Sequence, residues 1–440
     1  MRPARAAALA TVRRVFEQGA YADRALAAEA EGLDPRERAL AMQIAYGTVQ
    51  RRRTLDHVAQ GLVRRPLATL EPAVLAGIRI GLFQLLYLAG IPDHAAVGET
   101  VELVKRSSPG GAGLVNAVLR RAARERAPLL AGLPDDTPAG AALKHSVPDW
   151  LAELWWEELG PERARRLLRA VNEPAETAVR VNTLLATADE VRAELPVPSR
   201  GAPELPEGLV LDGAFDIPGS PLFRGGLITP QSRGSMLVAR ALDPQPGEET
   251  LDLCAAPGAK TTHLAALMQR RGRLVAVERQ PARARVLVET CRRMGANDVE
   301  VRAEDALALR DEAQFDRVLL DPPCSGLGTL QSRPDRRWHA SAEALGELAE
   351  LQAGLLGVAA AATRPGGHLV YSVCTISRRQ GGDLIDAFLG AEPEWEAVDL
   401  GARYPHWRQD DRGRYLQLLP DRDGTDGFFI ACLRRTGALT

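Results

Sequence analysis

The sequence lacks the features that mark several classes of protein. It has five cysteines in 440 residues, without a CxxC or HxxxH pairing, which argues against a disulfide framework and a zinc site. No GxGxxG string occurs. The longest apolar stretch, residues 74–91, contains Arg79 and Gln84, and a lone membrane-spanning helix does not tolerate such residues at its centre. We therefore expect a protein of the reducing cytoplasm, without a membrane span or a bound metal.

Lysine is also rare, and the basic residues are unevenly distributed. The three lysines are Lys105, Lys144 and Lys260, so a lysine in a glycine-containing loop at 260 suggests a specific role. Residues 1–130 hold 19 Lys+Arg against 12 Asp+Glu, whereas the remainder holds 36 against 45. The basic first part suggests contact with a polyanion, although a solvated arginine-rich surface would produce the same balance.

The length predicts several domains. Apolar residues recur at helical spacing between 5 and 125, which predicts an all-α domain over residues 1–130. Prolines and glycines then mark a boundary. Residues 140–235 read as a small α+β connector, with a helix at 150–168 and strands at 178–182 and 208–212.

Residues 236–440 alternate short apolar strands with helices, which predicts a parallel sheet of the Rossmann-like kind with helices on both faces. Ser341 is placed to cap a long helix whose end Gly366-Gly367 would mark. Two final strands, at 414–419 and 427–433, should close the sheet. The earlier strands are expected at 250–253, 274–278, 299–302, 317–320 and 368–373.

The string from Leu251 to Lys260 runs from a strand through a loop into a helix, at the sheet edge where α/β proteins bind ligands. Its single glycine, Gly258, does not suit the close approach of a pyrophosphate. Glu278, after the next strand, is placed to accept from ribose hydroxyls, and Asp305, after the third strand, can face an adenine amino group. Together these residues favour S-adenosyl-L-methionine (SAM), an adenosine cofactor without phosphates.

Two cysteines are expected at neighbouring strand tips. Asp321-Pro-Pro-Cys324 follows the fourth strand, and Cys374 ends the adjacent one. Amino-methyltransferases carry a similar Asp-Pro-Pro followed by an aromatic residue that stacks on the target base, and a cysteine cannot stack. The other three cysteines, Cys254, Cys291 and Cys432, are expected to pack mainly as small apolar side chains.

Two thiols suit methylation of a cytosine at C5. This carbon is a poor nucleophile, so a thiolate must first add to C6, and the thiol must later be eliminated with loss of the C5 proton. Asp321 is placed to contact the N3 edge of the base, and Lys260 to favour a thiolate by proximity. These residues alone leave open which thiol attacks.

The same strings resemble those of the RNA cytosine-C5 methyltransferases of the NOL1/NOP2/Sun family. The resemblance implies a class I SAM-dependent methyltransferase domain in which Cys374 is the nucleophile, Cys324 assists release and Asp321 lies in the catalytic site. It also implies a SAM site formed by Cys254, Ala255, Ala256, Pro257, Gly258, Ala259, Lys260, Glu278, Asp305 and Asp321.

The start of the chain resembles a NusB-type helical RNA-binding domain, in the strings at 40–49, 84–88, 91–97 and 115–120. This pairing of domains implies the bacterial branch whose substrate is a cytosine of 16S rRNA, of the cytosine(967)-C5 type. A monomer is expected. Two alternatives remain open, which are a tRNA cytosine methyltransferase and a non-catalytic RNA-binding factor with the same fold.

The sequence departs from the family pattern at three positions. Ala259 stands where the family usually has Gly, and Pro322 where it has Ala or Val. Val373 stands where it has Thr, directly before Cys374. The loss of that hydroxyl is expected to affect the rate more than the type of reaction.

Overall fold

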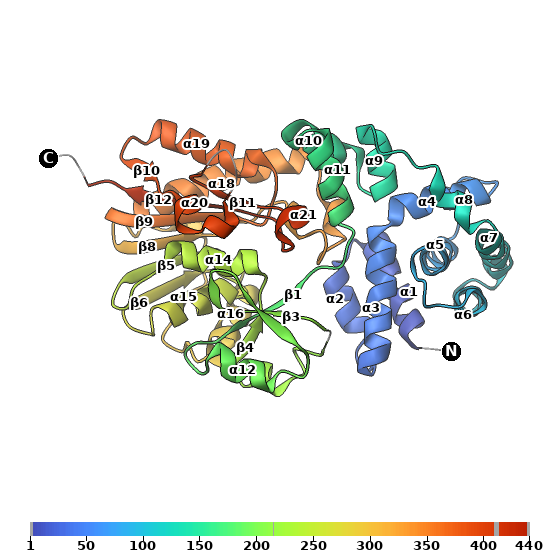
Figure 1. Cartoon of the computed structure of the whole chain (residues 1–440), viewed down its shortest axis with the longest axis horizontal. Coiled ribbons are helices and arrows are strands. Elements are labelled where there is room, and N and C mark those ends of the chain that lie inside the picture. The colour runs from blue at the N-terminus through green and yellow to red at the C-terminus, as the bar shows by residue number, and fades with distance from the viewer. Residues whose placement is uncertain (1–2, 214, 409–412, 438–440) are drawn as a thin grey trace. The chain divides into compact units, whose positions relative to one another are not determined.

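The computed structural model describes residues 3–213, 215–408 and 413–437 and divides the chain into two compact units. The helical unit comprises residues 1–173 and 330–341, and the sheet unit comprises residues 174–329 and 342–440 (Figure 1). The chain therefore crosses between the units three times. The segment 140–235, expected to form one connector, is divided between them at residue 173.

The helical unit contains twelve α-helices and two short 3-10 helices among its described residues. These elements are α1 (Pro3–Gln18), α2 (Ala22–Glu29), α3 (Pro35–Gln50), α4 (Arg52–Leu62), η1 (Leu67–Thr69), α5 (Pro72–Tyr87), α6 (Asp93–Ser107), η2 (Pro109–Gly111), α7 (Ala112–Arg124), α8 (Arg126–Ala131), α9 (Pro138–His145), α10 (Asp149–Leu159), α11 (Pro161–Ala170) and α17 (Arg336–His339). The all-α prediction for the first domain is confirmed.

Helix α5 is the central helix of this unit because almost every side chain between Ala73 and Leu85 is buried. Two glycines permit its close packing. A Cβ atom at Gly77 would overlap Val104 of α6, and one at Gly81 would overlap Leu119 of α7. The small residues at these positions thus set the distance between the three helices.

The segment 330–341 follows the Asp321–Cys324 string in sequence but packs in the helical unit, and we call it the strap. Arg337 of the strap is fully buried. Its guanidinium donates to the Asn172 side chain at 2.9 Å and to the backbone carbonyl oxygens of Gln50, Ser146, Val171 and Leu330. These hydrogen bonds explain why the strap belongs to this unit.

The helix expected at 150–168 is two helices, α10 and α11, separated by Gly160. This glycine has a φ of 77°, which an L side chain rarely adopts, and α11 restarts at Pro161. The periodicity of the apolar residues continues across the break, so it could not reveal the change of direction.

A small antiparallel sheet opens the sheet unit, with the strand order β2-β3-β1-β4. Its elements are β1 (Thr177–Val181), α12 (Ala188–Glu194), β2 (Ser199–Ala202), β3 (Leu205–Leu211), α13 (Pro221–Arg224) and β4 (Ile228–Pro230). The expected strands at 178–182 and 208–212 correspond to β1 and β3. Strands β2 and β4 were not predicted, because they are short and lie beside turn residues.

The large sheet has the order β10-β12-β9-β8-β5-β6-β7, with β11 paired to β12. Strands β9, β8, β5, β6 and β7 are parallel, and β12 and β10 are antiparallel additions at one edge. The strands are β5 (Glu249–Leu253), β6 (Arg273–Val277), β7 (Glu300–Arg302), β8 (Phe315–Leu320), β9 (Thr363–Val373), β10 (Trp395–Ala397), β11 (Leu416–Leu418) and β12 (Phe428–Arg435). The predicted class, a mostly parallel sheet after an α+β connector, is confirmed.

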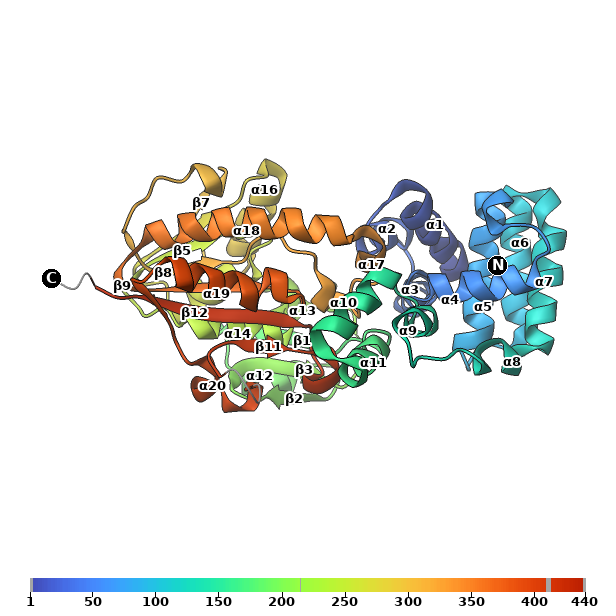
Figure 2. The same cartoon turned by 90° about the horizontal axis from the view of Figure 1, so that it is seen from above.

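Helices cover both faces of this sheet, as Figures 1 and 2 show. One face packs against α14, α15 and α16, and the other against α18 and α19. The remaining elements are α14 (Arg233–Leu242), α15 (Ala259–Leu267), α16 (Pro281–Arg293), η3 (Ala306–Ala308), η4 (Leu327–Thr329), α18 (Ala342–Ala362), η5 (Arg378–Gln380), α19 (Gly382–Ala391), α20 (Leu400–Arg403), η6 (Pro405–Trp407) and α21 (Pro420–Asp423).

Helix α18 has the length and hydropathy of a membrane-crossing helix, but it packs against β8 and β9 within this core. It ends at Ala362, earlier than expected, and Gly366-Gly367 lie inside β9. A Cβ atom at Gly367 would lie 3.0 Å from the Asp316 carbonyl oxygen. Gly367 therefore permits close approach within the sheet, and neither glycine caps the helix.

The edge of the sheet also differs from expectation. Strand β10 was not predicted, and the strand expected at 414–419 is the three-residue β11, which pairs only with β12. Short edge strands carry too little periodicity to be recognised from sequence.

Candidate active site

The order of the parallel strands reverses beside β5, because β6 lies on one side of it and β8 on the other. Open α/β sheets bind ligands at such a switch point, at the carboxyl ends of the strands. The strand ends here lead directly to the residues that sequence singled out, which are Cys254 after β5, Glu278 after β6, Asp305 after β7, Asp321 after β8 and Cys374 after β9.

The loop between β5 and α15 turns sharply at two positions. Cys254 has a φ of 64° and Gly258 a φ of 105°. A Cβ atom at Gly258 would lie 2.8 Å from Leu287 of α16, so both the conformation and the space require glycine. Ala259 is the first residue of α15, where alanine is a favourable helix former, so this departure from the family pattern fits the local structure.

The small sheet supports the first turn of α15. Arg180 of β1 is fully buried, and its guanidinium donates to Thr262 Oγ1 at 2.8 Å and to the Ala259 carbonyl oxygen at 3.3 Å. Its Nε donates to Gln231 Oε1 at 2.7 Å. The helix turn that carries Lys260 is thereby anchored to β1.

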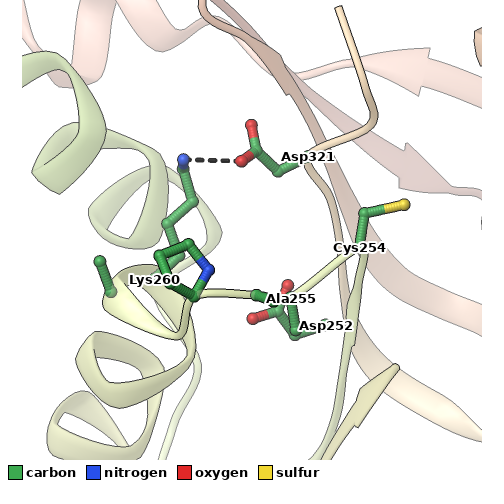
Figure 3. Close-up of a pocket in the computed structure, with 8 residues that line it drawn as sticks. Asp252, Cys254, Ala255, Lys260 and Asp321 are labelled. Carbon is green, nitrogen blue, oxygen red and sulfur yellow. Dashed lines mark hydrogen bonds and ion pairs between the residues drawn. The ribbon is translucent and has the colours of Figure 1, made fainter. Parts of the chain in front are cut away.

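Lys260 and Asp321 join two of these strand ends (Figure 3). Lys260 Nζ donates to Asp321 Oδ2 at 2.8 Å, and Ser372 Oγ of β9 donates to Asp321 Oδ1 at 2.9 Å. Burial opposes the charge of Lys260, but Asp321 outweighs it and raises the lysine pKa above its usual value, with a further contribution from Cys374. The lysine therefore remains a cation beside the thiol.

Asp252 lies beneath this ion pair and lines the same pocket as Cys254, Ala255, Lys260 and Asp321 (Figure 3). Thr261 Oγ1 donates to Asp252 Oδ2 at 2.6 Å, while Oδ1 has no hydrogen-bond partner among the described residues. Burial raises the pKa of Asp252 to about 7, and the charge of Asp321 acts in the same direction. A buried acceptor without a partner suits a cationic ligand.

An adjoining pocket combines carboxylates with apolar walls. Glu278 is buried and accepts from the Gln280 backbone N–H at 2.9 Å, and Asp305 accepts from the Leu307 N–H at 3.0 Å. The pocket is lined by Cys254, Val277, Glu278, Arg279, Gln280, Arg283, Asp305, Ala306, Pro323, Leu351 and Leu355. Its two carboxylates and its apolar side chains match the ribose hydroxyls and the adenine of a nucleoside.

The two thiols lie side by side, with Cys324 Sγ 3.3 Å from Cys374 Sγ. The hydrogen bond to Cys374 and burial together raise the pKa of Cys324 well above its usual value, so Cys324 remains a protonated thiol. The expectation that the two cysteines lie at neighbouring strand tips agrees with this geometry. Cys291 and Cys432 are buried in the core below, as expected, whereas Cys254 lines both pockets.

Val373 points away from Cys374. Its side chain packs in the cluster that includes Leu369 and Tyr371, on the sheet face opposite Ser372 and Cys374. A residue at this position contributes to the core under α18, so the concern that a hydroxyl is lost beside the nucleophile does not apply.

Sequence reasoning did not find several residues of this site. Leu351 and Leu355 lie in the long helix that the sequence predicts after Ser341, and their position in the pocket depends on how α18 packs. Ser325, Ser372, Thr375 and Gln380 are further buried polar residues beside the thiols. Ser325 and Thr375 directly follow the two cysteines and Ser372 lies two residues before Cys374, which was a signal for these three, whereas Gln380 had none.

Comparison with known proteins places the chain in a family. Residues 239–434 match the family model of the 16S rRNA methyltransferase RsmB/F, residues 2–124 match the NusB family, and residues 147–218 match the ferredoxin-like domain of RsmF/B-like methyltransferases. The probable ribosomal RNA small subunit methyltransferase B of Bacillus subtilis is 35% identical over 92% of both chains. The ribosomal RNA small subunit methyltransferase B of Pseudomonas putida is 34% identical over 99% of both.

A solved structure agrees with these matches over the whole chain. The crystal structure of PH0851 has a TM-score of 0.83 with 27% identity and covers 99% of both chains. The likeness therefore includes the NusB-type region, the connector and the catalytic sheet. The chain belongs to the RsmB/F family of 16S rRNA methyltransferases.

Proposed function

We propose that this rRNA methyltransferase transfers a methyl group from SAM to C5 of a cytosine in 16S rRNA through a covalent bond between Cys374 and C6 of the base. The observation that carries the proposal is the pair of thiols 3.3 Å apart at the tips of β8 and β9, beside the two pockets. C5 and C6 are adjacent atoms of the cytosine ring. One of two neighbouring thiols can therefore attack C6 while the other acts at C5.

Cys374 is the better nucleophile of the pair. Lys260 interacts with Cys374 electrostatically and favours a thiolate there, whereas Cys324 keeps its proton. Attack by the Cys374 thiolate forms the S–C6 bond and moves the C5–C6 π electrons onto C5 and the N3 side of the ring. SAM, when bound, supplies the methyl group that C5 then takes.

Asp321 and Cys324 act on the protons of the base. Asp321, held by Lys260 and Ser372, is placed to accept a hydrogen bond from N3–H of the cytosine and so to favour protonation of N3 from solvent as the thiolate attacks. After methyl transfer the C5 proton must leave, its bonding electrons re-form the C5–C6 double bond, and the S–C6 bond breaks. Once the Cys374 sulfur is bonded to C6, it no longer raises the pKa of Cys324, so Cys324 can lose its proton to solvent and then take the C5 proton in this elimination.

The residues around the pockets fit SAM. Glu278 would hold the ribose hydroxyls, Asp305 would face the adenine amino group, and Pro323, Leu351 and Leu355 would line the ring. The loop of Cys254, Ala255, Ala256, Pro257, Gly258, Ala259 and Lys260, with Asp321, would surround the remainder of the cofactor. The unpartnered oxygen of Asp252 would then face the positively charged methionine portion.

The NusB-type region supports rRNA rather than tRNA as the substrate, and its basic excess suits a polyanion. We propose that the target is the cytosine(967)-C5 type and that the monomeric enzyme acts in the cytoplasm. Bisulfite mapping of rRNA and tRNA from cells with and without the gene tests this. A methylcytosine that disappears from 16S rRNA is expected, and its disappearance from tRNA instead would contradict the proposal.

A further inference from the structure

Each cysteine of the thiol pair is followed by a buried hydroxyl residue, and these two residues contact each other. Ser325 follows Cys324, and Thr375 follows Cys374. Ser325 Oγ lies 2.8 Å from Thr375 Oγ1, and both side chains are buried. A hydrogen bond therefore joins the loop that carries Cys324 to the loop that carries Cys374, one residue beyond each cysteine.

Gln380 fixes the direction of that hydrogen bond. Its Oε1 accepts from the Ser325 backbone N–H at 3.2 Å and from the Ser325 hydroxyl at 2.8 Å. Because a hydroxyl has a single hydrogen, Ser325 must accept the hydrogen of Thr375. The three side chains form one chain of hydrogen bonds, from Thr375 through Ser325 to Gln380.

Gln380 is itself held from two sides. Its Nε2 donates to the Leu345 carbonyl oxygen of α18 at 3.3 Å, and its own carbonyl oxygen accepts from the Tyr371 hydroxyl at 2.7 Å. Gln380 is fully buried. The amide can satisfy both Ser325 and Leu345 in only one orientation, with the oxygen toward Ser325.

Other hydrogen bonds restrain the two ends of the Cys324 loop, where Asp321 accepts from Lys260 and Ser372 and the Gly326 carbonyl oxygen accepts from Thr329. Residues 321–326 have no regular secondary structure. The Pro323 carbonyl oxygen accepts from Gln352 Nε2 at 2.8 Å, and the Gly328 N–H donates to the Cys374 carbonyl oxygen at 3.0 Å. Within the described ranges, Gln380 is the residue whose side chain accepts from both the backbone N–H and the hydroxyl of Ser325.

We infer that Gln380 is a positioning residue that holds the Cys324 loop against the Cys374 loop, so that both thiols reach one C5–C6 bond of the cytosine. The inference rests on the proposed function for its catalytic consequence, but its geometric part concerns the free protein. Loss of Gln380 should therefore impair release, which needs Cys324, more than attack, which needs only Cys374.

The geometric part can be measured without RNA. Treatment of the full chain with diamide oxidises two neighbouring thiols to a disulfide while the diamide is reduced to its hydrazine. Peptide mapping would follow the Cys324–Cys374 crosslink. In Gln380→Met, which removes the acceptor, we expect this crosslink to form about tenfold more slowly. Gln380→Glu keeps an oxygen acceptor for Ser325 and should recover most of the rate.

Two further variants control for general destabilisation. Gln84→Met removes a buried glutamine of the helical unit that bonds Ile80 and Thr100, and it should leave the crosslinking rate unchanged. Thr375→Val keeps the shape and removes the hydroxyl, so it should slow crosslinking as Gln380→Met does. A wild-type crosslinking rate in folded Gln380→Met or in folded Thr375→Val would overturn the inference.

The catalytic part uses RNA and SAM in a single turnover. In Gln380→Met we expect methyl transfer within a few-fold of the wild-type rate and a covalent protein–RNA complex that persists about tenfold longer. Equal slowing of transfer and release would overturn the positioning role. If the wild-type enzyme formed no adduct while crosslinking still depended on Gln380, the proposed mechanism would fail and the geometry would stand.

Discussion

Lys260 and Asp321 form an ion pair that joins the first turn of α15 to the tip of β8, with Nζ 2.8 Å from Oδ2. The pair connects three parts of the site. Lys260 belongs to the cofactor loop and also interacts with Cys374, and Asp321 at the tip of β8 is bonded to Ser372 of β9. The cofactor loop and both catalytic strand ends are thus linked through two side chains.

Replacement of Lys260 should change the pH dependence of the reaction. Without the cation the Cys374 thiolate forms less readily, so Lys260→Met should lower the rate at neutral pH by about tenfold or more and move the acidic limb of the rate profile to higher pH. Lys260→Arg keeps the charge and should shift the limb less. Single-turnover rates across pH would measure both, and an unshifted limb in Lys260→Met would contradict this role.

The two cysteine variants should have opposite signatures. Cys374→Ala should neither methylate RNA nor form a covalent complex. Cys324→Ala should attack and transfer the methyl group, then remain attached to RNA in an adduct that survives denaturing gel electrophoresis. The reverse pattern would exchange the two roles, and methylation by Cys374→Ala without any adduct would exclude the covalent mechanism.

The acidic residues of the adenosine pocket should contribute to SAM affinity. Glu278→Ala and Asp305→Ala each remove a carboxylate that we place against the ribose or the adenine, and each should weaken binding about 10- to 100-fold. Glu304→Ala removes an exposed carboxylate that does not line the pocket and serves as the matched control. Calorimetry with SAM measures all three, and equal affinities would remove the cofactor assignment.

Asp252 should make the stability of the protein depend on pH. Its pKa of about 7 in the folded state is above the unfolded value of 3.8, so the folded protein binds the extra proton between these values. The contribution of the protonated Asp252 carboxyl to the free energy of unfolding is therefore lost as the pH rises from about 4 to about 7. Relative to wild type, Asp252→Asn should gain stability over that range, by at most about 4 kcal/mol. Thermal unfolding at pH 5 and pH 8 checks this, and a constant difference would contradict it.

Removal of the strap arginine should destabilise the helical unit. Arg337→Met leaves four backbone carbonyls and the Asn172 oxygen without this donor, and a cost of about 3 kcal/mol or more is expected. Arg333→Met changes an exposed strap residue and should be nearly neutral. Calorimetric unfolding of the full chain compares the two, and similar transition temperatures would contradict the anchoring role.

The local sequence was sufficient to predict the strands whose ends form the site. It was also sufficient to predict the type of chemistry that the residues at those ends can perform. Glu278, Asp305, Asp321 and Cys374 each follow a strand that the sequence predicts, and in a parallel sheet the carboxyl ends of such strands must meet at one edge. The identity of these residues therefore indicates the reaction class from the sequence alone.

Tertiary structure decided what depends on contacts between distant segments. The sequence places the strap 330–341 within the catalytic region, yet Arg337 packs with residues 50, 146 and 172 of the helical unit, and no local pattern encodes such a partner. Gln380 likewise carries no local signal, because its role depends on the packing of α18 and β9 around one amide group. The period of apolar residues indicates which face of a helix or strand is buried. It does not indicate which polar side chains form hydrogen bonds in the core, because those depend on the distances between elements.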